Sequence, residues 1–271
     1  MKSLGRLPPF SPVLHRLMGE LVLDAVSFEK LADLIERDTV LASNVLRVVN
    51  SSLYGMRAKV NSVRHGVSML GVANLRNIVL NLSVSQLWNR IRTPAGWSMQ
   101  RFNRHSTAVA MLADLVALET NAYYAEGAFT AGLLHDMGKL LIAMALPEEF
   151  AEINRLAGAD WREEAAHEEA ILGLSHADLS AAALTHWNLP APIVDAVRCH
   201  HAPPAEGRRL ALSSVLYVAD RTANQLGVGC RDAVTAGGDP AEFLNQIGLA
   251  GKAETLLGEF ARSFQASRRL F

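Results

Sequence analysis

Hydrophobic residues recur with a helical period along most of this chain. In residues 27–49 apolar side chains return every three or four positions, which places them on one face of a helix. Ser27 and Asp38 precede two such runs, and their side chains are of the type that caps a helix. The pattern returns in residues 61–88, where Gly71 is expected to separate two helices. No alternation of period two interrupts it, so this part of the chain is predicted to be helical.

A break follows at residues 92–99, where Pro94 and Gly96 interrupt the pattern. Six further helices are expected beyond it, in residues 100–119, 128–146, 163–173, 175–187, 191–201 and 210–226. Residues 133–146 are apolar almost all round, which is typical of a central buried helix. A helix start at Asp239-Pro240 and a last amphipathic helix over residues 252–264 complete the pattern.

The predicted fold is therefore all-α. An N-terminal helical bundle, residues 1–92, is expected to pack on a second helical unit, residues 99–225. Residues 226–271 are expected to form a C-terminal helical extension.

The composition is that of a compact globular protein with no general attraction to polyanions. Half of the 271 residues are hydrophobic, one fifth are charged, and the formal net charge is −1. Two cysteines are too few for a disulfide framework, which favours a reducing compartment. The longest apolar run, Leu140–Leu146, is far shorter than the roughly 20 residues that span a bilayer. We therefore expect a cytoplasmic protein without a nucleic-acid or membrane partner.

Five separated segments supply the side chains that one compact metal site would need. These side chains are His105, His135, Asp136, His176, His200, His201 and Asp220. Imidazole nitrogens combined with carboxylate oxygens suit iron, manganese, nickel or zinc. A buried aspartate beside a histidine in an apolar helix is costly unless a partner or a cation compensates its charge. The pattern therefore predicts a divalent transition-metal site with one or two ions.

The candidate ligands divide into two groups. A first ion would be held by His105, His135, Asp136 and Asp220. A second ion, or an anion pocket beside the first, would use His176 with one or both of His200 and His201. Lys139 lies one helical turn after His135 and would neutralise a phosphate oxygen in the same region. Asp136 and Lys139 are thus the candidate catalytic residues.

The seven candidate ligands together are stronger evidence for a metal site than any one of them, because a lone histidine is more often a hydrogen-bonded structural residue than a ligand. His65, His167 and His186 do not fit the constellation and are interpreted as structural. Cys199 is interpreted as a buried thiol. No glycine-rich phosphate loop and no Gly-x-Ser-x-Gly motif occurs, which disfavours other common hydrolase and nucleotide sites.

The order H…HD…H…HH…D resembles that of the HD metal-dependent phosphohydrolase superfamily. The flanking sequence more specifically resembles HDOD, the HD-related output domain of bacterial signalling proteins. The matching segments are residues 7–13, 31–55, 60–80, 127–142 and 172–201, and they include the distinctive strings NSSLYG and HWNLP.

The resemblance implies an all-α fold in which N-terminal helices pack against an HD-type core. It also implies an output or regulatory role with a signalling protein partner, often without demonstrable hydrolase activity. Many members of the family have lost metal ligands. In this chain all seven candidates fall, by resemblance, on ligand positions.

Two departures from the related HD-GYP phosphodiesterases limit what the resemblance implies. Arg101 stands one turn before the first histidine, where those enzymes carry an acidic residue, so a third metal is not expected. The double histidine is followed by APPAEGRRL and not by a Gly-Tyr-Pro loop. Hydrolysis of cyclic di-GMP is therefore not expected.

Two functions remain open from the sequence. The first is a signalling output module, with little or no hydrolase activity, whose HD-type site binds a metal or a nucleotide or phosphate ligand. The alternative is a metal-dependent phosphohydrolase acting on a nucleotide or phosphodiester.

An amphipathic helix in the N-terminal part is followed by four residues that are interpreted as shaping a tight turn: Asn50, Ser51, Ser52 and Tyr54. Residues 1–92 are expected to bind the partner, since a hydrolase would not require them.

Overall fold

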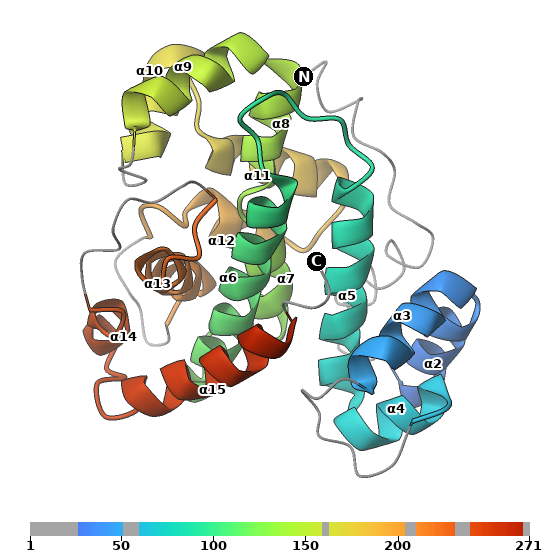
Figure 1. Cartoon of the computed structure of the whole chain (residues 1–271). Helices are drawn as coiled ribbons and strands as arrows, with labels where there is room; N and C mark the ends of the chain where they lie inside the picture. The colour runs from blue at the N-terminus through green and yellow to red at the C-terminus, as the bar shows by residue number, and fades with distance from the viewer. Residues whose placement is uncertain (1–26, 51–59, 159–162, 204–209, 231–238, 268–271) are drawn as a thin grey trace. The chain divides into compact units, whose positions relative to one another are not determined.

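All regular elements in the described part of this chain are helices. The structure, a computed structural model, describes residues 27–50, 60–158, 163–203, 210–230 and 239–267 (Figure 1). The all-α prediction is confirmed. No described helix combines the length and the apolar character needed to cross a bilayer.

The described residues fall into two compact units. The first contains residues 27–91 together with the end of the last helix from Ala261, and the second contains residues 92–260. Several expectations lie outside the described residues: the matching segment 7–13, the turn residues Ser51, Ser52 and Tyr54, and most of the segment after the double histidine.

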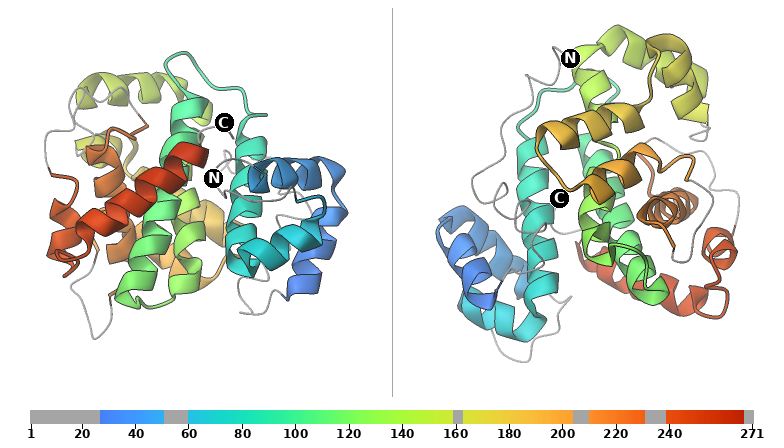
Figure 2. Two further views of the ribbon diagram at one scale, coloured as in Figure 1. Left: turned by 60° about the horizontal axis from the view of Figure 1, so that its bottom comes forward. Right: turned by 180° about the vertical axis from the view of Figure 1, so that it is seen from behind.

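The first unit is built from three short amphipathic helices and one longer helix in its described part. Its described helices are α2 (Phe28–Glu36), α3 (Thr39–Val49), α4 (Val63–Leu70) and α5 (Val72–Trp88). Ser27 and Asp38 cap the first two as expected, because their side-chain oxygens accept hydrogen bonds from amides of the first turn. Gly71 separates α4 from α5 with a φ of +80°, a conformation that favours glycine. Figures 1 and 2 show α2, α3 and α4 grouped beside the longer α5.

The core of this unit is aliphatic, and Asn50 fixes the backbone at its edge. Side chains without exposed surface include Leu31, Ile35, Val45, Val49, Leu75, Val79 and Leu80. The Asn50 amide donates to the Leu46 and Val60 carbonyl oxygens, and its oxygen accepts from the Val60 amide at 2.7 Å. Asn50 thus replaces backbone partners where α3 ends, as the sequence predicts for a turn residue.

The second unit surrounds the long helix α6. Its helices in the described ranges are α6 (Met99–Thr120), η3 (Ala125–Gly127), α7 (Ala128–Leu134), α8 (Met137–Ala145), α9 (Pro147–Ala157), α10 (Glu164–Leu172), α11 (His176–His186), α12 (Ala191–Arg198), α13 (Leu212–Gln225), α14 (Glu242–Gln246) and the first part of α15 (Ala253–Ser267). Helix α6 packs against α7 and α13, while α11 packs against α8 and α12.

The expectation of a single helix over residues 128–146 is wrong, although the expected burial of the segment is confirmed. The segment is divided into α7 and α8, and His135 and Asp136 form the turn between them. Asp136 has φ −97° and ψ 9°, which interrupts the helical path. The displaced Gly138 amide donates instead to Ser180 Oγ at 2.7 Å. A side-chain oxygen from α11 therefore compensates for the hydrogen bond that the break removes.

Three other expectations differ from the structure: the end of one helix, the burial of a cysteine and one helix that was not expected. Helix α12 ends at Arg198, so His200 and His201 lie in a turn and not on the predicted helix 191–201. Cys199, at the C-terminal cap, is partly exposed and not buried as expected. Helix α9 was not predicted, although it begins with Pro147 and two glutamates, which are common at a helix start.

Close packing at Gly138 joins the α7–α8 break to α11. A Cβ atom at Gly138 would lie 2.0 Å from the His176 carbonyl oxygen, far inside contact distance. No side chain larger than hydrogen fits there without moving α8 away from α11. The glycine is thus required by the approach of two backbones.

We predict that Gly138→Ala lowers the free energy of unfolding by about 2 kcal/mol or more, because it overpacks a backbone contact. Gly251, whose Cβ would meet nothing within 4 Å, supplies the control. Gly251→Ala should change stability by less than about 1 kcal/mol. Urea denaturation followed by circular dichroism measures both variants, and equal stabilities would contradict the close approach of α8 and α11.

Candidate metal centre

All seven sequence-predicted ligands converge in the second unit. They come from α6, the α7–α8 turn, the first turn of α11, the turn after α12, and α13. Six of them have no more than 4% of their surface exposed, and only His201 is partly exposed. The sequence therefore identified residues that the fold does bring together, whereas His65, His167 and His186 belong to none of the ligand groups among the described residues.

Asp136 lies at the middle of the cluster, and its two oxygens face different neighbours. Oδ1 lies 3.1 Å from His176 Nε2, 3.4 Å from His135 Nε2 and 3.8 Å from His200 Nε2. Oδ2 lies 3.3 Å from His105 Nε2. This single carboxylate therefore connects four imidazole rings that come from four parts of the chain.

Asp220 supplies the second carboxylate of the centre. Its Oδ1 lies 3.2 Å from His105 Nε2 and 3.8 Å from His135 Nε2. Asn224, one turn later on α13, donates to the same oxygen at 2.7 Å and holds the carboxylate in place. His105 and His135 thus lie between two carboxylates, as the expected first ion site requires.

Hydrogen bonds fix the orientation of the four buried imidazoles. In each ring Nδ1 lies 2.6–2.8 Å from an oxygen: Val228 O for His105, Gly132 O for His135, Glu168 Oε2 for His176 and Val197 O for His200. Carbonyl and carboxylate oxygens can only accept, so Nδ1 must donate in every case. The Nε2 atoms are consequently the ones that face the centre, which is how metal-binding histidines are oriented.

The donor atoms fit a divalent ion. His135 Nε2 and His200 Nε2 are inaccessible to solvent and have no hydrogen-bond partner, a costly arrangement for polar atoms. Nitrogen and oxygen ligands of one transition-metal ion are about 3.0–3.4 Å apart, given bonds of about 2.1 Å. The shortest contacts of Asp136 and Asp220 with the imidazoles, 3.1–3.3 Å, match this spacing.

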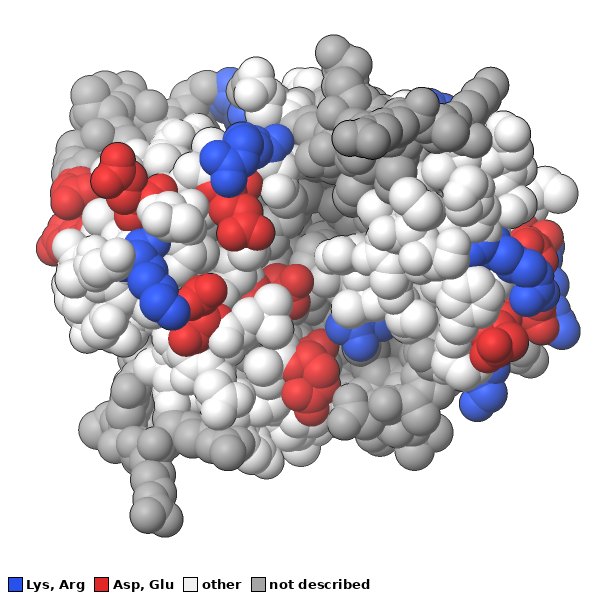
Figure 3. All heavy atoms as spheres, turned by 90° about the horizontal axis from the view of Figure 1, so that it is seen from below, with Lys and Arg blue, Asp and Glu red and all other residues white. Residues whose placement is uncertain are grey.

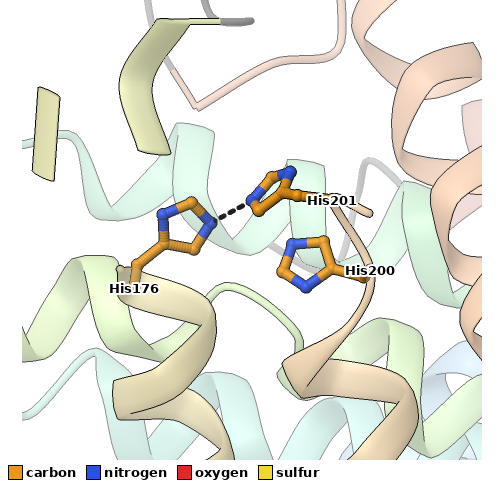
Figure 4. A group of neighbouring side chains, drawn as sticks. All are labelled: His176, His200 and His201. Carbon is orange, nitrogen blue, oxygen red and sulfur yellow. Dashed lines mark hydrogen bonds between the residues drawn. The ribbon is translucent and has the colours of Figure 1, made fainter. Parts of the chain in front are cut away.

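A second group of rings adjoins the first. Figure 4 shows His176, His200 and His201 with their rings close together, and His176 Nε2 lies 2.7 Å from His201 Nε2. One ligand atom from each of the three lies within 4.8 Å of the others. A further group of His135, Asp136 and His200 satisfies the same distance. The geometry therefore offers overlapping ligand sets for one ion or two.

Protons and metal ions would compete for two of the rings. Burial opposes the charged form of His105, but hydrogen bonds to Asp136 and Asp220 outweigh it and raise its pKa to about 9. Burial also opposes the charged form of His176, but Glu168 and Asp136 outweigh it and raise its pKa to about 10. In both rings a proton on Nε2 and a divalent ion are alternatives, because either one neutralises the same carboxylates.

The double histidine is kept neutral. Burial, reinforced by the neighbouring imidazoles, lowers the pKa of His200 to about 3. The same two causes lower the pKa of His201 well below its ordinary value. Neutral imidazole is the form that binds metals, so this pair needs no deprotonation at physiological pH.

Lys139 lies against the centre as expected, but it is already paired. Its Nζ atom is 2.8 Å from Asp136 Oδ2 and 3.1 Å from Glu164 Oε2. Burial disfavours its ammonium form, yet the two carboxylates outweigh burial and raise its pKa well above the ordinary value. Lys139 therefore remains charged beside Asp136.

Two glutamates on α10 were missed by the sequence interpretation. Glu168 Oε2 accepts from both the backbone amide and Nδ1 of His176, each at 2.6 Å, and Glu164 pairs with Lys139. Both glutamates are buried, with 1% and 6% of their surface exposed. The sequence did contain a signal for their role, because their four-residue spacing places them on one face of the predicted helix 163–173. That signal was not recognised, because acidic residues on a helix rich in alanine and glutamate normally indicate a solvent-exposed face.

A cavity of about 210 Å³ opens beside the centre. Lys139, Glu164 and Cys230 form its wall on the side of the ligands. Its lining also contains Trp97, whose ring centroid lies 5.2 Å from that of Phe102 and 5.7 Å from that of Phe150. Arg101 also lines it. The cavity lining therefore combines an aromatic residue with charged side chains of both signs.

The comparisons agree with this architecture. A model of the HDOD domain matches residues 7–203. An uncharacterised protein from Treponema pallidum (strain Nichols) is 24% identical over 191 residues, which are 66% of this chain and 34% of that protein. The chain thus spans about a third of the length of this curated relative.

Two solved structures share the fold. An HDOD domain protein of unknown function from Geobacter sulfurreducens is 26% identical, with a TM-score of 0.74 over 95% of this chain and 84% of that one. A proposed phosphohydrolase from Shewanella amazonensis SB2B is 23% identical, with a TM-score of 0.77 over 100% of this chain and 97% of that one.

We predict that Glu168→Gln weakens metal binding about 10–100-fold, because the carboxylate that orients His176 loses its charge. Glu169 is adjacent and exposed, so Glu169→Gln is the matched control and should leave affinity unchanged. Competition with a chelating dye measures the affinity of each variant for zinc. Equal affinities in the two variants would show that Glu168 does not support the centre.

Proposed function

Because this chain belongs to the HDOD domain family, we propose that it is a signal-transduction output module built around a centre for one or two divalent transition-metal ions. The observation that carries the proposal is the set of Nε2 atoms that face Asp136 and Asp220, with each buried ring locked through Nδ1. This arrangement is costly in a protein without a cation and useful in one that binds a cation.

Iron, manganese, nickel and zinc are the ions that the mixed imidazole and carboxylate set favours. When bound, such an ion polarises a phosphoryl oxygen and makes a bound water more acidic. The chain itself would position that ion through Asp136, hold the imidazoles in one tautomer, and keep the charge of Lys139 beside the cavity.

We further propose that the cavity beside the centre accepts a small phosphate-bearing ligand such as a nucleotide. Arg101 and Lys139 line the cavity, where Lys139 is paired with Asp136 and Glu164 and would in addition contact a phosphate oxygen, and Trp97 provides a ring on which a planar base would stack. A phosphate placed near Lys139 would also lie next to Asp136, and hence next to a bound ion.

A metal-dependent phosphohydrolase is the second candidate function. It is favoured by the closeness of the cavity to the ligand set, because Lys139 lines the cavity and pairs with Asp136. The Shewanella amazonensis protein of the same fold is itself a proposed phosphohydrolase. The substrate class would then be a nucleotide or a phosphodiester.

The proposed partner is a signalling protein and neither nucleic acid nor membrane. On the face drawn in Figure 3 the described acidic and basic side chains form small groups of mixed sign among uncharged surface. Such a face favours a protein partner over a polyanion, which would require a continuous basic patch.

We expect the purified protein to contain at least one equivalent of a transition metal by elemental analysis, and Asp136→Ala to contain none, because the substitution removes the carboxylate shared by four imidazoles. Asp195, exposed on α12, gives the control Asp195→Ala, which should retain the metal. Turnover of nucleotides, cyclic dinucleotides and a generic phosphodiester should be slow or absent. Rapid turnover that Asp136→Ala abolishes and Asp195→Ala retains would replace the signalling proposal with the hydrolase.

We also predict that removal of residues 1–92 reduces partner capture more than Asp136→Ala does, because the described residues of the first unit contribute no ligand to the centre and are proposed to bind the partner. Co-purification of the partner with each variant is the measurement, with circular dichroism as the check on folding. If Asp136→Ala lost all biological output while keeping both fold and partner, the centre and not the first unit would carry the function.

A further inference from the structure

A short loop after α13 brings Cys230 to the metal centre. The loop begins at Gly227, whose φ of +71° turns the chain at the helix end. The Val228 amide then returns to the Ala223 carbonyl at 2.9 Å, and the Val228 carbonyl accepts from His105 Nδ1 at 2.7 Å. Cys230 follows two residues later. The segment that fixes the orientation of His105 therefore also fixes the position of the thiol.

The distances place the sulfur where a ligand would lie. Cys230 Sγ is 3.6 Å from Asp136 Oδ2, and it forms a group with His105 and Asp136 in which all ligand atoms are within 4.8 Å of one another. For bonds of about 2.3 Å to sulfur and 2.1 Å to oxygen, two ligands of one tetrahedral ion are about 3.6 Å apart. The observed separation agrees with shared coordination.

A hydrogen bond alone is a weaker explanation for this contact. A thiol is a poor donor, and Asp136 Oδ2 already receives the Lys139 ammonium at 2.8 Å. His135 Nε2, on the residue before Asp136, is buried and has no hydrogen-bond partner, which points to a cation at the centre that Cys230 adjoins.

We propose that Cys230 is a thiolate ligand of the ion held by His105 and Asp136, an inference that rests on the metal centre proposed above. On binding, the S–H bond breaks, its proton passes to solvent, and the sulfur lone pair forms the bond to the ion. No oxidant or reductant is required.

The thiolate changes which ions the centre prefers. A soft sulfur ligand favours zinc and iron over manganese and magnesium, which prefer oxygen. Cys230 also lines the cavity, so one face of this ligand is reachable by small molecules. The centre would therefore differ from an all-histidine and carboxylate site in both selectivity and chemical reactivity.

Cobalt(II) substitution tests the proposal without relying on activity. The wild-type chain loaded with Co²⁺ should show a sulfur-to-cobalt charge-transfer band in the near ultraviolet together with visible d–d bands. Cys230→Ser and Cys230→Ala should lose the charge-transfer band and keep d–d bands from the remaining ligands. Both should bind zinc at least about tenfold more weakly, while their manganese affinity changes less than about threefold.

Cys199 gives the matched control, because it is the other free cysteine and is also partly exposed. Cys199→Ser should keep the charge-transfer band and the zinc affinity of the wild type. Wild-type protein that shows d–d bands but no charge-transfer band, or a band that survives Cys230→Ser, would overturn the thiolate ligand and leave the metal centre intact. Failure of the wild type to take up any cobalt, zinc or iron would overturn both.

Discussion

One buried carboxylate dictates the organisation of the second unit. Asp136 has 1% of its surface exposed, and an uncompensated carboxylate in such a place would cost several kcal/mol. Burial alone would raise its pKa, but His135, Lys139 and the neighbouring imidazoles outweigh burial and hold the pKa well below the ordinary value. The break between α7 and α8, the close approach of α11 at Gly138 and the pairing of Lys139 all serve to surround this one charge.

Two of the imidazoles that surround Asp136 come from helix ends. His135 and His200 each follow the last turn of a helix, α7 and α12, and each donates from Nδ1 to the carbonyl three residues before it. Carbonyls in a last turn lack intrahelical partners, so the imidazole satisfies an acceptor that the helix leaves open. The same hydrogen bond fixes the tautomer and the ring orientation, so that Nε2 faces Asp136. One hydrogen bond thus both completes the helix end and orients the candidate ligand.

The sequence could predict which residues lie together at the candidate centre but not the local structure that brings them there. Residue type and order were sufficient to select His105, Asp136 and Asp220, because buried polar groups in apolar helices need partners that compensate their charge. The helical period alone did not reveal the turn at Asp136, since residues 128–146 are apolar on both sides of it and the Ser180 hydroxyl that makes the break possible comes from another helix. The contact of Glu168 with His176 crosses the turn between α10 and α11, and the contact of Cys230 with Asp136 joins residues 94 positions apart. Neither contact follows from the helical period of one segment.

Stability and ligand state in this unit are coupled through the same buried charges. Protons on His105 and His176 neutralise the carboxylates at neutral pH, and a divalent ion would replace them from the same directions. An ion that binds only the folded centre stabilises the fold by an amount that grows with its concentration, about 2.7 kcal/mol at a hundredfold excess over the dissociation constant. Because α6, α8, α11 and α13 all contribute to the centre, that free energy acts on the packing of the whole unit. In the proposed signalling module, binding of an ion would therefore stabilise the helices around the centre without turnover of a substrate.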